Sequence, residues 1–185
     1  LGRISDRRIL ALNSYENRVY QVGLEDSAPL IAKFYRPGRW SDEAIHEEHG
    51  FALELAAAEV PVIPPMVRNG DTLFKFDGFR FALFERRGGR WPELGSATER
   101  EWMGRFLGRI HALGRRHAFR HREHMSIERM GDDSRNFLLD QGWLPSHLEA
   151  AYDSLTADLL ERICDVFAGV GHLQDLRLHG DCHRG

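Results

Sequence analysis

A lysine and a glutamate in this sequence have the types and spacing of an ion pair between a strand and a helix. Lys33 lies in the middle of an apolar strand pattern at residues 30–35. A buried ammonium is very costly unless an anion pairs with it. The helix pattern that follows offers four carboxylates, Glu43, Glu47, Glu48 and Glu54. Glu48 lies on the apolar stripe of this helix, so we predict that Glu48 pairs with Lys33 and place Glu47 second. Such a pair would also fit a purely structural role.

A second group of reactive side chains lies near the carboxyl end, in His179-Gly180-Asp181-Cys182-His183. Asp181 on a glycine turn has the chemistry to accept a proton from a substrate hydroxyl. His179, Asp181 and His183 at alternate positions also fit the ligands of a zinc or iron hydrolase. That ligand geometry requires a strand, whereas Gly180 favours a loop. A further histidine group is interpreted as a solvated helix end: His117, His121 and His124.

The turn at residues 13–17 is a candidate phosphate contact. Its sequence, Asn13-Ser14-Tyr15-Glu16-Asn17, joins two strand patterns. Its backbone N–H groups and the Ser14 hydroxyl are suitable phosphate donors. The turn contains no glycine, so it differs from the usual glycine-rich phosphate loop and by itself also fits an ordinary polar hairpin.

The composition restricts the class of protein. The chain has 185 residues, of which 42% are apolar and 29% charged, which is typical of a soluble globular protein. It has no apolar run near the ~18 residues of a membrane-spanning helix. Its net charge of −3 gives no reason to expect nucleic acid as a partner. Two cysteines, Cys164 and Cys182, suit a reducing compartment. We therefore predict a cytoplasmic, monomeric protein that binds neither membranes nor nucleic acid.

The elements that position these side chains follow from hydrophobic periodicity. Strands are expected at residues 8–12, 18–22, 30–35, 72–76 and 79–85, and a helix at residues 41–58. Asp77-Gly78 is a strong hairpin signal between the last two strands.

After Gly88-Gly89 the pattern becomes helical. A capping box from Ser96 to Glu99 begins one helix, and Pro145 begins another that reaches about residue 168. Between them, residues 114–143 are expected to be irregular, with a short helix near residues 135–139. A short strand is expected at residues 176–178. The order predicts an α+β protein with a β-rich amino lobe and a helical carboxyl lobe.

In combination these motifs resemble the bacterial stress response kinase A family, which belongs with the aminoglycoside phosphotransferase and choline kinase-like proteins. Four segments carry the resemblance: Leu12-Asn13-Ser14-Tyr15-Glu16-Asn17-Arg18-Val19-Tyr20, Lys33-Phe34-Tyr35-Arg36-Pro37, Glu47-Glu48-His49 and Leu178-His179-Gly180-Asp181-Cys182-His183. The resemblance implies a protein kinase-like two-lobe fold. Residues 1–87 would be the ATP-binding lobe, and residues 88–185 the first part of the helical lobe, interrupted inside the catalytic loop.

The resemblance also implies roles for individual residues. Ser14 matches a loop serine that contacts ATP, Lys33 would hold the α- and β-phosphates, and Glu48 would orient Lys33. Residues 85–87 resemble the hinge whose backbone binds adenine. Asp181 matches the residue that accepts the hydroxyl proton. The candidate ATP-binding residues are therefore Ser14, Lys33, Glu48, Glu85 and Arg87.

The family loop continues from His-Gly-Asp through four residues to an asparagine that binds magnesium. Counted from Asp181, this asparagine would be residue 186, one position after Gly185. A second magnesium-binding aspartate would follow on a later strand. We therefore expect the Mg²⁺ ligands beyond residues 1–185, and we expect the chain to be a piece of a longer polypeptide that is close to inactive alone.

Three functional hypotheses remain. The leading one is an ATP- and Mg²⁺-dependent phosphotransferase, a Ser/Thr protein kinase of the stress response type that transfers the γ-phosphoryl group to a protein hydroxyl. The second is a small-molecule kinase that acts on an aminoglycoside, choline or homoserine-like hydroxyl. The third is a non-catalytic nucleotide-binding scaffold.

Overall fold

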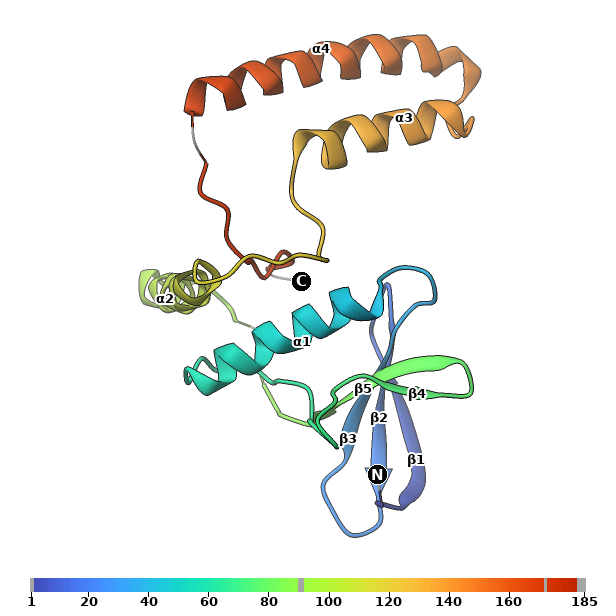
Figure 1. Ribbon diagram of the computed structural model, residues 1–185, viewed down its shortest axis with the longest axis vertical. Coiled ribbons are helices and arrows are strands. Elements are labelled where there is room, and N and C mark those ends of the chain that lie inside the picture. The colour runs from blue at the N-terminus through green and yellow to red at the C-terminus, as the bar shows by residue number, and fades with distance from the viewer. Residues whose placement is uncertain (1, 90–91, 172, 183–185) are drawn as a thin grey trace. The chain divides into compact units, whose positions relative to one another are not determined.

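A five-stranded antiparallel sheet forms the amino-terminal part of the protein, with strand order β1-β2-β3-β5-β4 (Figure 1). The computed structural model describes residues 2–89, 92–171 and 173–182. The strands are β1 (Ser5–Leu12), β2 (Arg18–Leu24), β3 (Leu30–Phe34), β4 (Phe74–Phe76) and β5 (Phe79–Glu85). The five predicted strands are confirmed, with small differences at their ends.

The hairpin between β4 and β5 forms where the Asp77-Gly78 pair predicts it. Asp77 has φ 48° and Gly78 has φ 77°, and a two-residue type I′ turn requires both of these left-handed conformations. The first of the two strands begins later than predicted, at Phe74. The cause is Asp71, whose carboxylate accepts the backbone N–H groups of Thr72 (2.6 Å) and Leu73 (3.0 Å) and holds them in a turn.

Helix α1 (Asp42–Ala57) packs on the face of the sheet that carries Lys33. Ser41 caps its amino end, where the side-chain oxygen accepts the N–H of Ala44 at 3.1 Å. Lys33 lies opposite Ala82 of β5, and residues opposite each other in antiparallel strands share a face. Ala82 belongs to an apolar cluster with Ile45 of α1. The other face has its own cluster, Leu24, Leu30, Ala32 and Leu83.

Helix α2 (Ala97–Gly114) packs against α1 through a third apolar cluster, Phe51, Leu55, Val60, Ile110 and Leu113. The predicted capping box is confirmed: Ser96 Oγ accepts the Glu99 N–H at 3.2 Å, and Glu99 Oε2 accepts the Ser96 N–H at 2.9 Å.

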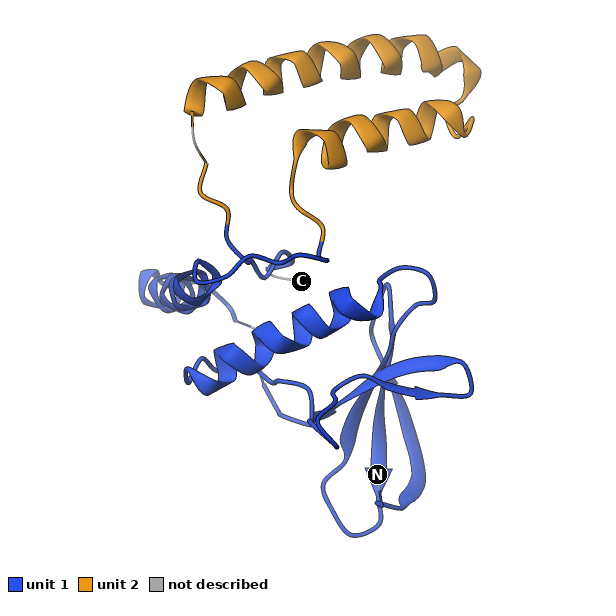
Figure 2. Ribbon diagram, viewed as in Figure 1, with its two compact units in different colours: residues 1–122, 176–185 blue, residues 123–175 orange. Residues whose placement is uncertain are grey.

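Two compact units divide the chain, residues 1–122 with 176–185 and residues 123–175 (Figure 2). Because α2 shares a core with α1, these units do not follow the predicted boundary between Arg87 and Gly88. The division into an ATP-binding lobe and a helical lobe stays a prediction about function.

The second unit contains a π-helical turn η1 (Glu128–Asp132), helix α3 (Asp133–Asp140) and helix α4 (Ser146–Val170). The short helix predicted near residues 135–139 is therefore longer. Arg135 of α3 donates to Thr156 Oγ1 of α4 at 3.0 Å and forms an ion pair with Asp153. Among the described helices, none has the length and apolar content needed to cross a membrane.

The strand predicted at residues 176–178 is wrong. This segment is irregular, and it is held by helices in place of a strand partner. The Arg177 N–H donates to the Gly114 carbonyl at the end of α2 (3.3 Å), and the Arg177 guanidinium binds Glu54 of α1. The apolar alternation does not follow burial here, because Arg177 is buried against α1 and α2 while Leu178 is exposed and Leu176 only partly buried.

Candidate active site

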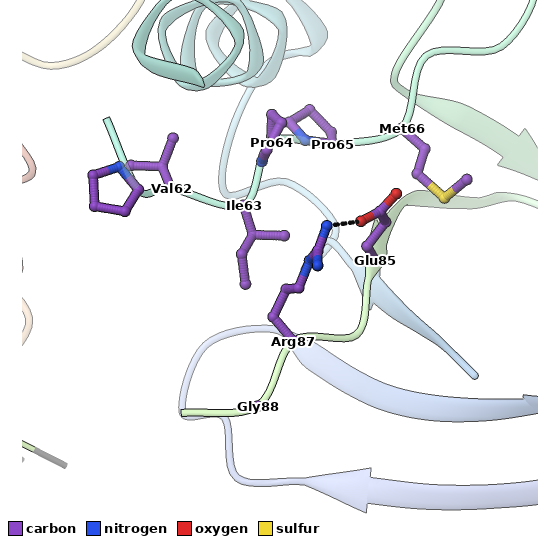
Figure 3. A pocket seen from close by; sticks show the side chains of 9 residues that line it. Val62, Ile63, Pro64, Pro65, Met66, Glu85, Arg87 and Gly88 are labelled. Carbon is purple, nitrogen blue, oxygen red and sulfur yellow. Dashed lines mark hydrogen bonds and ion pairs between the residues drawn. The ribbon is translucent and has the colours of Figure 1, made fainter. Parts of the chain in front are cut away.

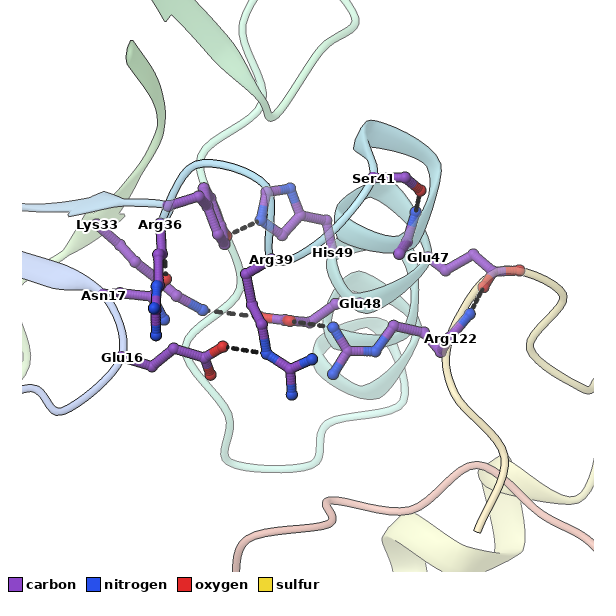
Figure 4. Close-up of polar contacts among 12 residues, drawn as sticks. Glu16, Asn17, Lys33, Arg36, Arg39, Ser41, Glu47, Glu48, His49 and Arg122 are labelled. Atoms are coloured by element: carbon purple, nitrogen blue, oxygen red, sulfur yellow. Dashed lines mark hydrogen bonds and ion pairs between the residues drawn. The ribbon is translucent and has the colours of Figure 1, made fainter. Parts of the chain in front are cut away.

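The predicted ion pair between Lys33 and Glu48 is confirmed. Lys33 Nζ lies 2.9 Å from Glu48 Oε1, and the ammonium also lies 4.8 Å from the centre of the Tyr35 ring (Figure 4). The Lys33 side chain is 23% exposed, so the pair is partly open to solvent. Burial pulls the pKa of Glu48 upward, but the nearby Lys33 and Arg122 outweigh it and hold this pKa below its usual range. Lys33, on an apolar strand, is therefore paired with the ionised carboxylate of Glu48.

A second cation, Arg122, binds the other oxygen of Glu48. Arg122 Nη1 lies 3.1 Å from Glu48 Oε2, and the guanidinium stacks 4.0 Å from the centre of the Trp40 ring. Arg39 lies 4.4 Å from the centre of the same ring. Arg122 is not predicted from the sequence, because it lies in the arginine- and histidine-rich segment after α2, where the sequence pattern does not distinguish it from its neighbours.

Glu47, the second choice as a partner for Lys33, instead binds backbone. Its carboxylate accepts the N–H groups of Arg120 (2.6 Å), His121 (2.8 Å) and Arg122 (3.0 Å). Burial raises the pKa of Glu47, but the three N–H groups outweigh burial and lower it. Glu47 and Glu48 together therefore hold residues 120–122 against α1.

The turn at residues 13–17 is tied to the segment that follows β3. Glu16 Oε1 accepts from Arg39 Nε at 2.6 Å, and Asn17 Oδ1 accepts the Arg36 N–H at 3.4 Å (Figure 4). Ser14 Oγ donates to the Asn17 carbonyl at 2.8 Å, so in this structure its hydroxyl stabilises the turn itself. Tyr15 at the tip is fully exposed.

The side chains of Glu85 and Arg87 lie away from Lys33. Glu85 is opposite Leu30 in the sheet, on the face that does not carry α1. Arg87 Nη2 lies 2.7 Å from Glu85 Oε2, and both side chains line a cavity of about 610 Å³ beside residues 61–66 (Figure 3). Any contact of Glu85 or Arg87 with a nucleotide on the Lys33 face would therefore come from the backbone. The Arg86 side chain differs, because its Nε donates to Gln21 Oε1 at 3.2 Å, and Gln21 lies opposite Ile31 on the Lys33 face.

A buried polar chain supports the Lys33 side of the sheet. The Tyr35 hydroxyl lies 2.6 Å from His49 Nε2, and His49 Nδ1 lies 2.8 Å from Thr72 Oγ1. Burial lowers the pKa of His49 to about 4 and raises that of Tyr35, so both side chains are neutral near pH 7. This chain joins β3, α1 and the turn before β4.

Asp181 follows a glycine turn, as predicted. Gly180 has φ 78°, a conformation that favours glycine, and the Asp181 N–H donates to His179 Nδ1 at 3.2 Å. Asp181 is exposed, and Arg177 anchors its segment to α1. Among the described residues no three His, Cys, Asp or Glu side chains gather as metal ligands. His183, which the metal hypothesis needs, lies outside the described residues.

Arg177 is a second residue that the sequence analysis missed. It lies between Leu176 and Leu178, and a charged side chain in an apolar pattern is the signal that singles out Lys33. In a chain with 23 arginines among 25 basic residues, this signal carries less weight for an arginine than for a lysine.

Comparisons with known proteins agree with the resemblance. Residues 8–185 match the model of the phosphotransferase enzyme family. The chain is 41% identical over 184 residues to the serine/threonine protein kinase RdoA of Salmonella typhimurium, covering 100% of this chain and 56% of that protein. It is 42% identical to the stress response kinase A of Escherichia coli, covering 97% and 54%. The chain thus spans about half the length of the curated relatives it matches.

Two solved structures share the fold. The amicoumacin kinase hAmiN, in complex with AMP-PNP, Ca²⁺ and Ami, has a TM-score of 0.58 at 19% identity, covering 84% of this chain and 49% of that one. A microcompartment-associated aminopropanol kinase has a TM-score of 0.58 at 20% identity, covering 75% and 50%. The sheet with its lysine, the helix with its glutamate and the glycine turn with its aspartate therefore occur in a kinase-like fold, and the chain belongs to the phosphotransferase enzyme family.

Proposed function

We propose that the whole protein containing this chain is an ATP-dependent phosphotransferase that moves the γ-phosphoryl group of ATP to a hydroxyl. The observation that carries the proposal is the 2.9 Å ion pair between Lys33 and Glu48. Kinases require such a pair between a strand lysine and a helix glutamate, because it places an ammonium against the phosphates. The match of residues 8–185 to the phosphotransferase enzyme family supports this role of the pair over a purely structural one.

Each candidate residue has one role in this reaction. Lys33 contacts the α- and β-phosphates, and Glu48 holds the ammonium in position. The turn at residues 13–17 covers the phosphates with its backbone, and the backbone of residues 85–87 contacts adenine. Asp181 accepts the proton of the attacking hydroxyl, which makes the oxygen a better nucleophile as the γ-phosphoryl group leaves ADP.

Phosphoryl transfer from ATP needs a divalent cation, for which we propose Mg²⁺. The cation neutralises charge between the β- and γ-phosphates. We expect its ligands beyond residues 1–185, because the resemblance implies a metal-binding asparagine at position 186 and an aspartate on a later strand. Residues 1–185 accordingly supply the groups that contact ATP and the proton acceptor.

The proposed acceptor is a serine or threonine of a protein, in the cytoplasm. This choice rests on the relatives at 41–42% identity, which are named as a serine/threonine protein kinase and stress response kinases. The second candidate, a small-molecule kinase, rests on the two solved structures, which are named for amicoumacin and aminopropanol. Transfer of labelled phosphate to protein, compared with transfer to amino alcohols and aminoglycosides, distinguishes the two.

The test of the nucleotide site uses both lysines of the chain. In the whole protein, a saturating concentration of Mg-ATP should raise the melting temperature, since a ligand at 100 times its Kd adds about 2.7 kcal/mol to the stability. Lys33→Ala should weaken ATP binding about 10- to 100-fold, because a charge-assisted contact contributes roughly 1.5–3 kcal/mol.

Lys75→Ala is the matched control. Lys75 pairs with Asp42 at 2.5 Å and is 64% exposed on the β4–β5 hairpin, so its removal should leave the ATP-induced shift unchanged. If Mg-ATP raises the melting temperature of Lys33→Ala as much as that of wild type, Lys33 is not part of the ATP site.

The scaffold hypothesis makes a different prediction for the natural sequence after Gly185. Asparagine at position 186, followed by an apolar strand with an aspartate, supports catalysis. Other residues at both places favour a scaffold that binds nucleotide without transferring phosphate.

A further inference from the structure

Arg177 is a buried arginine four residues before Asp181. Its side chain is only 5% exposed and binds the Glu54 carboxylate of α1 with both terminal nitrogens, Nη1–Oε1 at 3.2 Å and Nη2–Oε2 at 2.7 Å. Nη2 also donates to the carbonyl of Leu113 at 3.2 Å, and the guanidinium lies 4.2 Å from the centre of the Phe51 ring. One side chain therefore joins the segment of Asp181 to α1 and to the end of α2.

The backbone of Arg177 is held at the same place. Its N–H donates to the carbonyl of Gly114 at 3.3 Å. A Cβ atom at Gly114 would lie 2.3 Å from the Arg177 carbonyl oxygen, so only glycine allows this approach. Residue 177 is thus fixed through both its backbone and its side chain, two residues before the His179–Asp181 turn.

Burying Arg177 requires its charged guanidinium to lose water, so the contact with Glu54 is not explained by stability alone. Arg177 Nε is buried with no hydrogen-bond partner among the described residues, and an unpaired buried polar group destabilises the folded state. A buried ion pair is often no more stabilising than apolar residues of similar volume. What a bidentate arginine–carboxylate pair adds is directional geometry, because the planar guanidinium fits the carboxylate in one orientation.

Helix α1 connects this geometry to Lys33. Glu48 and Glu54 lie six residues apart on α1, which is about 9 Å along a helix. One rigid element thus holds Lys33 at one position and the segment of Asp181 at the other.

We propose that Arg177 is a positioning residue: through Glu54 it fixes the His179–Asp181 turn relative to the helix that holds Lys33. The inference rests on the proposed phosphotransferase function. Arg177 itself does not contact a substrate in this scheme. It sets where the Asp181 carboxylate stands when the hydroxyl arrives.

The test compares three variants of the whole protein, Arg177→Lys, Glu54→Gln and Arg109→Lys. The first keeps the charge but loses the two-pronged geometry, and the second keeps the size but loses the charge. Arg109 is the control, because it binds the carbonyls of Ala58 (3.2 Å) and Glu59 (2.8 Å) just after the end of α1, and these contacts do not involve the segment of Asp181.

Arg177→Lys and Glu54→Gln should each lower kcat about 10- to 100-fold, since a misplacement of about 1 Å at a reacting group can cost a factor of about 10². The KM for ATP should change less than about 3-fold, because a weakened contact at residue 177 leaves the Lys33–Glu48 pair intact. The double variant should lose no more than the worse single variant. Arg109→Lys should match wild type.

Hydrogen exchange gives a readout that does not depend on activity. Both Arg177→Lys and Glu54→Gln should speed the exchange of the amides of residues 177 and 181, which donate to the Gly114 carbonyl and to His179 Nδ1, at least 10-fold while leaving β3 unchanged. Normal kcat and normal exchange in these two variants would overturn the proposal, and so would a KM for ATP that rises in proportion to the loss of kcat. If wild type transfers no phosphate, the proposed function fails, and the exchange of these two amides alone decides whether Arg177 fixes the turn.

Discussion

In the proposed reaction, the exposed carboxylate of Asp181 accepts the proton of the attacking hydroxyl. In the whole protein, Asp181→Asn should lower the rate of phosphoryl transfer about 10²- to 10⁴-fold, because an amide of the same size cannot accept the hydroxyl proton. The measurement is transfer of labelled phosphate from ATP.

Two further measurements keep this test specific. The ATP-induced shift in melting temperature should stay as in wild type, because the amide leaves the fold and the Lys33 contact in place. If Asp181→Asn transfers phosphate at the wild-type rate, Asp181 is not the proton acceptor. The second measurement is the metal content of the purified whole protein. Stoichiometric bound zinc or iron, together with a hydrolytic activity that needs no ATP, would support the metal hydrolase hypothesis in place of the kinase hypothesis.

At the scale of elements, the junction between α2 and residues 176–178 depends on one glycine. Gly114→Ala should destabilise the protein by about 1–3 kcal/mol, because the new Cβ would lie 2.3 Å from the Arg177 carbonyl oxygen and the packed backbone must move. Unfolding in urea measures the change.

Gly108→Ala in the same helix is the control. A Cβ at Gly108 meets no atom within 4 Å, so alanine should stabilise α2 by about 0.5–1 kcal/mol through its higher helix propensity. Equal effects of the two substitutions would show that propensity, and not the approach of Arg177, decides the result at Gly114.

Helix α1 is the element on which the site converges. Glu48 binds Lys33, Glu47 binds the backbone of residues 120–122, and Glu54 binds Arg177. A shift of this helix would therefore change the environment of Lys33 and of the segment of Asp181 together.

At the scale of the whole molecule, His49 makes the stability depend on pH. The imidazole is buried between Tyr35 and Thr72, and burial lowers its pKa from 6.5 to about 4. The unfolded chain therefore binds a proton that the folded protein excludes, so stability rises with pH between about 4 and 6.5 and is constant above that window for this group.

The urea midpoint should accordingly fall as the pH is lowered from 6.5 toward 4, beyond what carboxylates contribute. The same series on His49→Gln isolates this contribution, and the exposed His147→Gln serves as control. An NMR titration that finds the His49 ring changing charge near pH 6.5 in the folded protein would contradict the assignment.

The sequence by itself determined the features that depend on neighbours in the chain. The positions of the strands along the chain, the turn at Asp77-Gly78 and the capping box at Ser96 follow from hydrophobic period and from backbone preferences, which act over a few residues. The pairing of Lys33 with Glu48 could also be predicted, because the helix directly follows the strand and its apolar stripe selects one glutamate.

Only the tertiary structure decided contacts between segments that are distant in the sequence. Glu47 meets the backbone of Arg120 to Arg122, and Glu54 meets Arg177 across 123 positions. No local period encodes such partners, because they depend on how α2 packs on α1 and on where the chain returns after the second unit. The strand predicted at residues 176–178 fails for the same reason: the alternation of Leu176, Arg177 and Leu178 favours buried leucines, whereas the distant partner Glu54 buries Arg177 and leaves Leu178 exposed.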